Sequence, residues 1–201
     1  MLEVFSVIVL ILSATVHEYM HGFVANQLGD STAKNAGRLT LNPIKHLDFF
    51  GSFLLPLSML LIGSPFLFGW AKPVPYNPNN LSDQKYGDAK VAIAGPLANL
   101  LMALLFSVVL RFLNPVSTIF VLISEIIIIN LALMIFNLIP ITPLDGSKVL
   151  ACFLPDKWRH KLLYMDDRLS MLILLIFVFF GFNYLSPVIY WLFSFLTGVA
   201  I

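Results

Sequence analysis

Residues 2–28 of the chain read LEVFSVIVLILSATVHEYMHGFVANQL. A run of about 20 mainly apolar residues is long enough for a helix to cross the hydrocarbon core of a bilayer, and this stretch exceeds that length. It also contains His17, Glu18 and His21. Ionisable side chains are costly inside a membrane unless they face the interior of the protein. The stretch therefore predicts a membrane-spanning helix that contributes polar groups to an internal site.

The composition extends this prediction to the whole chain, which has 201 residues, 59% of them hydrophobic and 11% charged. Soluble domains are much less apolar. Further spans are expected at 91–113, 116–139 and 169–185, and 186–201 is expected to cross the membrane, pair back as a hairpin or lie at the interface. We predict an all-α polytopic membrane protein in which residues 1–201 form a single domain.

Two other features exclude classes of function. The net charge is +1 and no basic patch is present, which excludes nucleic-acid binding. Cys152 is the sole cysteine, so the chain has no internal disulfide and no cysteine-based metal cluster. A metal site in this chain must therefore use histidines and carboxylates.

The segment 49–70 is apolar but is interrupted by Pro56, Gly63 and Pro65. Irregular backbone at membrane depth is tolerated where protein or water surrounds it, so we expect this segment to be re-entrant. Eleven of the twelve lysines and arginines then share one side of the membrane, with Arg111 on the other. Because basic loops stay in the cytoplasm, the first helix should end on the cytoplasmic side of a plasma membrane.

His17, Glu18 and His21 form the pattern H-E-x-x-H on the predicted helix. Positions i and i+4 share one helix face, so both imidazoles can bind one metal ion. The glutamate can take a proton from a metal-bound water, whose pKa falls to about 7. By chance the composition would give about 0.001 such matches. The motif predicts one zinc ion per chain and hydrolysis with Glu18 as general base.

A catalytic zinc needs a third protein ligand besides two histidines. Asp145 follows the span predicted at 116–139, and counting membrane crossings brings it to the side towards which the histidine pair is displaced. Glu125 lies inside that span, nearer the far leaflet, and is the alternative ligand. Asp145 is therefore favoured by this geometric argument.

The other ionisable candidates have simpler roles. If Glu125 is not a ligand, we expect a protonated or hydrogen-bonded carboxyl in the bundle interior, paired with a polar neighbour such as Asn130. His46 and His160 lie in polar loops and are expected to face solvent.

A function of another class is also open from the residues alone. The histidine pair could pass or sense zinc in a transporter or a non-catalytic membrane binding protein. A transport path usually needs several weak sites from which ions can leave. Three ligands and one general base form a closed set, which favours an enzyme.

Three motifs resemble the signatures of the site-2 protease family, peptidase family M50. They are HEYMH at 17–21, AGPLAN at 94–99, and the segment 137–146, which begins NLIP and ends LDG. They fall on three successive predicted spans in the order typical of the family. Residues 41–48 and 69–78 are similar to its compact subgroup, so we expect neither a PDZ nor a CBS domain.

The resemblance implies a zinc-dependent endopeptidase with a three-helix catalytic core that cuts transmembrane segments of other membrane proteins near the cytoplasmic side. It implies zinc bound by His17, His21 and Asp145, with Glu18 as the base.

It also implies that Asn99 and Asn137 lie near the metal, where an amide could bind the substrate backbone or the developing oxyanion. An asparagine in a membrane span also often hydrogen-bonds between helices.

The segment 71–80 is rich in proline and cannot form a helix. A helical substrate must unwind before it is cut, and an unwound strand can pair with an exposed edge. This segment, with 37–41, which alternates like a short strand, could supply such an edge; alternatively it plugs the cavity. The candidates for substrate contact are Trp70, Lys72, Pro73, Pro75 and Asn77.

Overall fold

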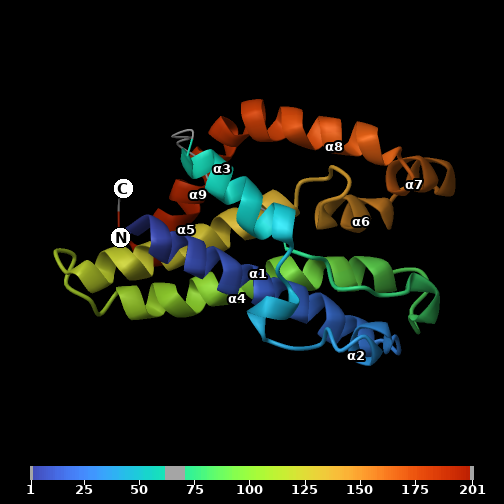
Figure 1. The fold of residues 1–201 in the computed structure, drawn as a ribbon, viewed down its shortest axis with the longest axis horizontal. Helices are drawn as coiled ribbons and strands as arrows, with labels where there is room; N and C mark the ends of the chain where they lie inside the picture. Colours follow the sequence, from blue (N-terminus) through green and yellow to red (C-terminus); the bar gives the residue numbers. More distant parts are fainter. Residues whose placement is uncertain (1, 62–70, 200–201) are drawn as a thin grey trace.

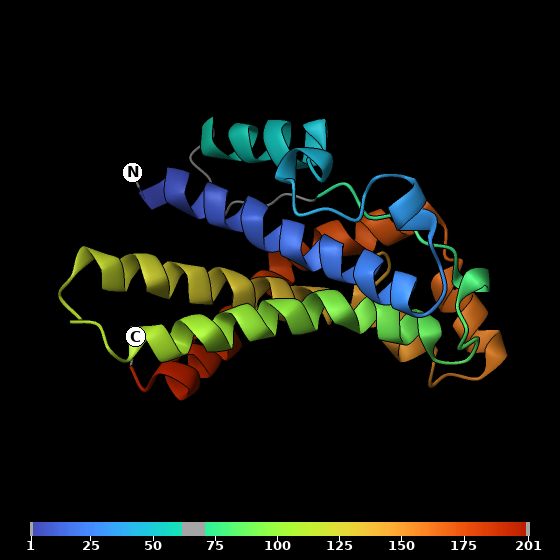
Figure 2. The same cartoon turned by 90° about the horizontal axis from the view of Figure 1, so that it is seen from below.

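The computed structural model describes residues 2–61 and 71–199. Within these residues, three helices are long and apolar enough to cross a membrane: α1 (Leu2–Gln27), α4 (Gly87–Leu110) and α5 (Thr118–Asn137). They run side by side along the long axis of the molecule (Figures 1 and 2). The described residues contain no strand. The predicted class, an all-α polytopic membrane protein, is confirmed.

The ends of two long helices differ by a few residues from the expected bounds, for local reasons. Helix α4 begins at Gly87, before the predicted start at 91, because the Asp83 carboxylate accepts two backbone hydrogen bonds just ahead of it. Helix α5 begins at Thr118 because Ser117 caps it, with its hydroxyl oxygen accepting from the backbone N–H of Phe120 at 3.2 Å.

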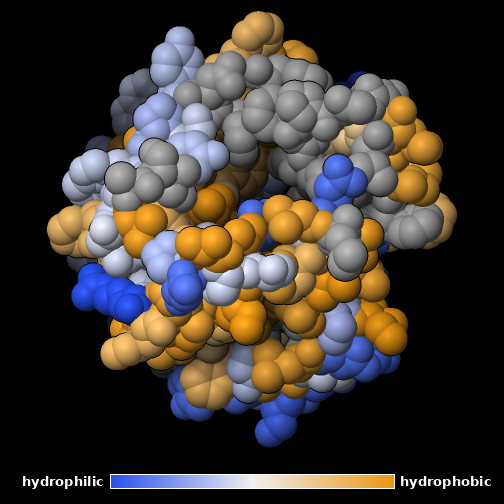
Figure 3. All heavy atoms as spheres, turned by 90° about the vertical axis from the view of Figure 1, so that its left-hand side faces the viewer, coloured by the Kyte–Doolittle hydropathy of each residue, from blue (hydrophilic) through white to orange (hydrophobic). Residues whose placement is uncertain are grey.

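The long helices expose apolar side chains and bury polar ones, the reverse of a soluble protein. On α1 the residues Ser13, Thr15, His17 and His21 are buried, whereas Leu2, Val4, Ile8 and Leu12 are exposed. Figure 3 shows hydrophobic residues over much of the surface at the end that holds the α4–α5 turn. An apolar surface of this extent suits contact with lipid.

The apolar core lies between α4, α5 and α9 (Phe182–Thr197), where Ile127, Leu131 and Phe193 are fully buried. Helix α8 (Asp167–Ile176), the π-helical segment η4 (Phe177–Gly181) and α9 form one continuous helical run. Figure 1 shows that α8 and α9 meet at an angle, as expected of a helix that contains a π-helical turn. Since no turn separates 169–185 from 186–199, this region is not a hairpin.

The expected re-entrant segment 49–70 is described as far as residue 61. It is helical there, with η2 (Phe49–Leu54) in π-helical form followed by α3 (Leu55–Leu61), and α3 lies along α1 on the side away from α4 (Figure 2). Pro56 is the second residue of α3, and the helical run that begins at Phe49 continues past it to Leu61. Residues 62–70, including Gly63, Pro65 and Trp70, lie outside the described residues.

Helices α2 (Thr32–Asn35), α6 (Asp145–Ala151) and α7 (Asp156–Leu163) lie towards the end of the bundle opposite the α4–α5 turn (Figure 1). Two short 3-10 helices, η1 (Pro43–Lys45) and η3 (Pro78–Asn80), lie in the connections between the longer helices.

The short strand predicted at 37–41 is wrong. Gly37 has φ of +64° and closes a turn after α2, so the chain bonds locally rather than to a neighbouring strand. The link to the segment beginning at Ala71 is made by a side chain instead. The Arg38 guanidinium donates to the carbonyl oxygens of Lys72 and Pro73, at 2.9 and 3.3 Å.

Candidate metal centre

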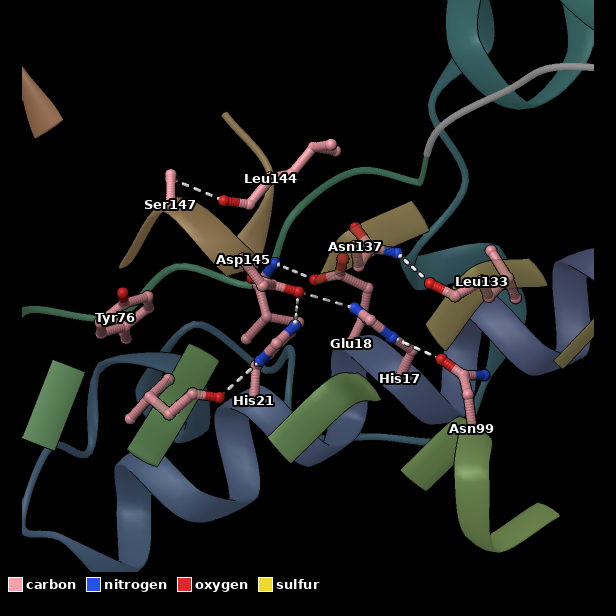
Figure 4. A network of polar contacts seen from close by, with 12 residues as sticks. His17, Glu18, His21, Tyr76, Asn99, Leu133, Asn137, Leu144, Asp145 and Ser147 are labelled. Carbon is pink, nitrogen blue, oxygen red and sulfur yellow. Dashed lines mark hydrogen bonds and ion pairs between the residues drawn. The ribbon is translucent and has the colours of Figure 1, made fainter. Parts of the chain in front are cut away.

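Two histidines from α1 and one aspartate from α6 converge in the bundle interior (Figure 4). The Nε2 atoms of His17 and His21 lie 3.1 and 3.2 Å from the same oxygen, Oδ2 of Asp145. The imidazole centroids are 4.6 Å apart and the rings are nearly perpendicular. All three residues are buried, with exposed fractions of 5%, 7% and 8%. The structure thus brings together the two histidines and the aspartate that the sequence singled out.

This donor set fits a zinc ion. Ligands about 2.0–2.2 Å from a tetrahedral zinc lie about 3.3–3.6 Å from one another. The two nitrogen-to-oxygen separations are close to this range. Two imidazole nitrogens and a carboxylate oxygen are also the ligand types of many catalytic zinc sites, which keep the fourth position open.

The outer nitrogens of both imidazoles are fixed by acceptors. His17 Nδ1 lies 2.6 Å from Oδ1 of Asn99, and His21 Nδ1 lies 2.8 Å from the backbone carbonyl oxygen of Val91. Because both oxygens accept hydrogen bonds, each Nδ1 carries the proton and each Nε2 can present a lone pair to a metal. Partners of this kind set the tautomer and the ring orientation of metal-binding histidines.

Two glycines allow the ligand-bearing elements to approach closely. A Cβ atom on Gly95 of α4 would lie 2.5 Å from Nε2 of His17, so the ring needs a glycine opposite it. A Cβ atom on Gly146 of α6 would lie 2.2 Å from the backbone oxygen of Leu138, just beyond the end of α5. Any side chain at Gly146 would push α6, and with it Asp145, away from the histidines.

Glu18 is a second carboxylate beside the two histidines, with an oxygen within 4.8 Å of their ligand nitrogens. Asp145 is the nearer candidate for a third ligand, because its Oδ2 lies 3.1 and 3.2 Å from the Nε2 atoms of the two imidazoles. Glu18 directly follows His17 in the helix, and its Oε2 accepts a hydrogen bond from the backbone N–H of Val74 at 2.8 Å. Figure 4 shows the Glu18 carboxylate close to the metal-ligand candidates.

The two asparagines differ in their surroundings. Asn99 is fully buried, and its Nδ2 group donates to Oδ1 of Asn130 at 3.0 Å and lies 3.4 Å from the backbone oxygen of Ser13. Asn99 therefore connects α1, α4 and α5 by hydrogen bonds and orients the His17 ring. Asn137 is half-buried at the end of α5, and its Nδ2 group donates to the backbone oxygen of Leu133. Substrate contact by either amide stays a prediction.

The extended segment from Ala71 to Asn77 lies over α1 and is tied to several elements. The backbone N–H of Asn77 donates to the buried Asp30 carboxylate at 2.7 Å. Tyr76 donates its hydroxyl proton to Asp88 of α4, and its ring faces the Lys148 ammonium of α6 at 5.0 Å. Burial and the Asp88 carboxylate raise the pKa of Tyr76, so its hydroxyl stays protonated.

Four substrate-contact candidates are described, and all are exposed: Lys72, Pro73, Pro75 and Asn77. They lie on both sides of the buried Val74, whose backbone N–H binds Glu18. The fifth candidate, Trp70, lies outside the described residues.

Glu125 is far from the histidine pair. Its Oε1 accepts a hydrogen bond from the Ser6 hydroxyl at 2.7 Å, and Ser6 precedes His17 by eleven residues, about 16 Å along a helix. The alternative with Glu125 as third ligand is therefore not supported. The expected pairing of Glu125 with Asn130 is wrong, because Asn130 donates to Ser13 and to its own helix.

Of the two loop histidines, His160 is exposed as expected, but the prediction for His46 is wrong. His46 is 1% exposed, because its Nε2–H donates to the carbonyl oxygen of Thr40 at 2.7 Å and its own carbonyl accepts from Lys72. A polar loop sequence gives no sign of such burial when the loop folds under another segment.

Sequence reasoning missed Val74 as a neighbour of the glutamate. One signal was available, since a single apolar residue between two prolines in a polar segment is a candidate for burial. Its partner could not be found from spacing, because 56 residues separate Glu18 from Val74.

Comparison with known proteins finds relatives that cover most of the chain. The chain is 40% identical over 184 residues to the protein named Putative zinc metalloprotease YwhC of Bacillus subtilis, which covers 86% of this chain and 79% of that protein. It is 27% identical to Putative zinc metalloprotease Rip2 of Mycolicibacterium smegmatis, over 94% and 73% of the two chains. It is 31% identical to Putative zinc metalloprotease MJ0611 of Methanocaldococcus jannaschii, over 73% and 72%. No family model and no solved structure matches the chain.

Proposed function

This chain belongs to the same family as these zinc metalloproteases, and from that premise we propose that it is an intramembrane protease of the site-2 type. It is a membrane-embedded hydrolase whose cofactor is zinc. Its substrates, on this proposal, are membrane proteins cut in or near their transmembrane segments. One observation carries the proposal: the histidine pair that converges on Asp145 lies on a helix apolar enough to span a bilayer.

The proposed ligands are His17, His21 and Asp145. When bound, zinc supplies a Lewis acid that lowers the pKa of a water molecule and polarises the carbonyl of the peptide bond. The imidazoles enter this role with their Nδ1 protons committed to Asn99 and to the carbonyl of Val91.

Glu18 is the proposed general acid and base. Its carboxylate takes a proton from water as the water oxygen bonds to the carbonyl carbon. It then delivers that proton to the amide nitrogen as the carbon–nitrogen bond breaks. Asn137, half-buried at the end of α5, is proposed to bind the substrate backbone, whereas Asn99 acts through His17.

The proposed substrate side is the extended segment at 71–77, whose exposed residues flank Val74, and the backbone N–H of Val74 binds Glu18. The orientation proposed is the one with these residues towards the cytoplasm, in the plasma membrane. It is supported by the basic residues of α2 and α7, two helices that lie at one end of the bundle in Figure 1, and by Arg111, which follows the last residue of α4 at the α4–α5 turn. The segment 49–70 is proposed to return to that same side, and the chain to belong to the compact subgroup of the family.

Cells that carry wild-type protein or Glu18→Gln provide the first test. Single-span membrane proteins that accumulate intact with Glu18→Gln are identified by mass spectrometry, and each is then incubated with the purified full chain in liposomes. We expect cleavage within or beside the span by wild type, no cleavage by Glu18→Gln, and one zinc ion in both. Cleavage by Glu18→Gln at a rate near that of wild type would contradict the role of Glu18. Zinc flux through the liposomes without cleavage would contradict the protease function.

A further inference from the structure

The Glu18 carboxylate receives a hydrogen bond from a part of the chain outside the helix bundle. The backbone N–H of Val74 donates to Oε2 at 2.8 Å. Among the described residues, the other oxygen, Oε1, accepts no hydrogen bond. The carboxylate is therefore held through one oxygen while the second stays available.

The position of Val74 is fixed from both sides without help from Glu18. On one side the N–H of Lys72 donates to the carbonyl of His46 at 2.8 Å, and Arg38 binds two carbonyl oxygens of the segment. On the other side Asn77 is bound to Asp30, which is fully buried and also accepts from Thr32 and Asn80. The Val74 N–H is thus held in place by hydrogen bonds that do not involve Glu18.

The side chain of Val74 fixes the height of the segment above α1. It is 6% exposed, and its Cγ1 atom lies 3.0 Å from the point where a Cβ on Gly22 would stand. Gly22 follows Glu18 by four residues, so it lies on the same face one turn later. The valine therefore rests on α1 beside the glutamate whose carboxylate its backbone binds.

The flanking prolines make this donor unique within the tripeptide 73–75. Pro73 and Pro75 have no backbone N–H and fix their own φ angles, and a residue before proline avoids the helical region. The tripeptide can therefore offer one N–H group, that of Val74, in an extended backbone. The sequence Pro-Val-Pro delivers a single donor in a defined direction.

We propose that the Val74 backbone amide is a positioning group for the general base: it fixes the plane of the Glu18 carboxylate so that Oε1 faces the attacking water. This inference rests on the proposed function. A glutamate has three rotatable side-chain bonds, and a catalytic group that moves by about 1 Å loses about 100-fold in rate. Without the amide, the carboxylate would still be present but would face the water for a smaller part of the time.

Amide hydrogen exchange in the full-length protein tests the contact without any need for activity. A peptide that spans 73–75 reports one exchangeable backbone amide within those residues. We expect Glu18→Ala to raise the exchange rate of Val74 at least about tenfold and to leave Ser82, whose N–H donates to the carbonyl of Leu28, unchanged. Equal exchange of Val74 in wild type and Glu18→Ala would overturn the contact.

Replacement of the Val74 amide by an ester tests the consequence, because it removes the N–H and keeps the side chain. We expect kcat to fall about 10- to 100-fold with KM within about threefold and zinc content unchanged. Val74→Pro, compared with Val74→Ala, should repeat this result without synthetic chemistry. The control is an ester at Ser82, which removes the hydrogen bond of 2.7 Å from the Ser82 N–H to the carbonyl of Leu28, just beyond the end of α1, and should leave kcat unchanged.

The outcomes separate this inference from the proposed function. A Val74 ester with kcat within about twofold of wild type, in protein that cleaves its substrate, overturns the positioning role alone. So does an equal fall in kcat for the Ser82 ester, since that would indicate a general loss of loop structure. If wild type cleaves nothing, the proposed function fails, and the exchange experiment still decides whether the amide holds Glu18.

Discussion

The two halves of the candidate site are built from different kinds of structure. The metal-ligand half, His17, His21 and Asp145, stands on helices that approach closely at Gly95 and Gly146. The half that holds the general base joins Glu18 to Val74, in a segment fixed by polar contacts with Arg38, His46 and Asp30.

Because the two halves are built differently, a change in each half should affect a different measured quantity. Displacing a helix should reduce zinc binding, and activity falls as a result. Displacing the loop should reduce kcat while zinc stays bound. Three substitutions test this division, from the largest expected effect to the smallest, and a fourth tests the stability of the carboxylate that anchors the loop half.

Asp145→Ala should break the metal-ligand half. Removing the oxygen that touches both imidazoles leaves two ligands, so we expect zinc content below about a tenth of wild type and activity at least about 1000-fold lower. Zinc is measured by elemental analysis of the purified protein. Glu125→Gln is the matched control and should keep its zinc, since Glu125 pairs with Ser6. Full zinc stoichiometry in Asp145→Ala would remove Asp145 from the ligand set.

Gly95→Ala should weaken the same half without removing a ligand. The added methyl group would lie 2.5–2.6 Å from atoms of the His17 ring, so the ring must move. We expect zinc affinity to fall about 10- to 100-fold, the range found when outer partners of a ligand are disturbed. Competition with a chelator measures the affinity. An affinity equal to that of wild type would show that the ring moves without cost.

Gly22→Ala should affect the loop half alone and so sharpens the comparison. Its methyl group would stand 3.0 Å from Cγ1 of Val74 and 3.2 Å from Cβ of Ala33, which lifts the segment by a few tenths of an ångström. We expect kcat to fall about three- to tenfold with zinc affinity unchanged. Single-turnover cleavage and chelator competition on the same preparation separate the two quantities. A loss of zinc here would show that the halves are not independent.

Asp30→Asn should change stability in a pH-dependent way. Burial acts to raise the pKa of Asp30, but hydrogen bonds from Thr32, Asn80 and Asn77 lower it more. The ionised carboxylate therefore stabilises the fold above its unfolded pKa of about 3.9, and this stability is lost as pH falls through the lower folded pKa. We expect Asp30→Asn to cost about 1–3 kcal/mol at pH 7. Thermal unfolding should show the difference from wild type shrinking below about pH 4; a constant difference would contradict the assignment.

The helical half of the site could be predicted because its spacing is local. The period of α1 places His17 and His21 on one face, and the number of spans brings Asp145 to their side of the bundle. Outside the site, the π-helical turn at 177–181 could not be predicted, because an apolar run has the same composition in a π-helix as in an α-helix.

The loop half could not be predicted, because its contacts join residues far apart in irregular backbone. Val74 reaches Glu18 across 56 residues, and His46 is buried by the segment that passes over it. The strand expected at 37–41 failed for the same reason: Arg38 bonds through its side chain, and alternation in sequence does not show whether another strand lies within reach.

The Pro-Val-Pro tripeptide also limits how a peptide could dock beside it. Its three residues carry three carbonyl oxygens but one backbone N–H, and that N–H is already bound to Glu18. The N–H groups of an incoming strand can therefore donate to the carbonyl oxygens of the tripeptide. Its carbonyl oxygens can accept a hydrogen bond from the tripeptide only if they displace Glu18 from the Val74 N–H. A complete β-ladder along the tripeptide is thus incompatible with the hydrogen bond between Val74 and Glu18. Recognition of a peptide at this segment must therefore depend on side chains or on backbone hydrogen bonds with other parts of the protein.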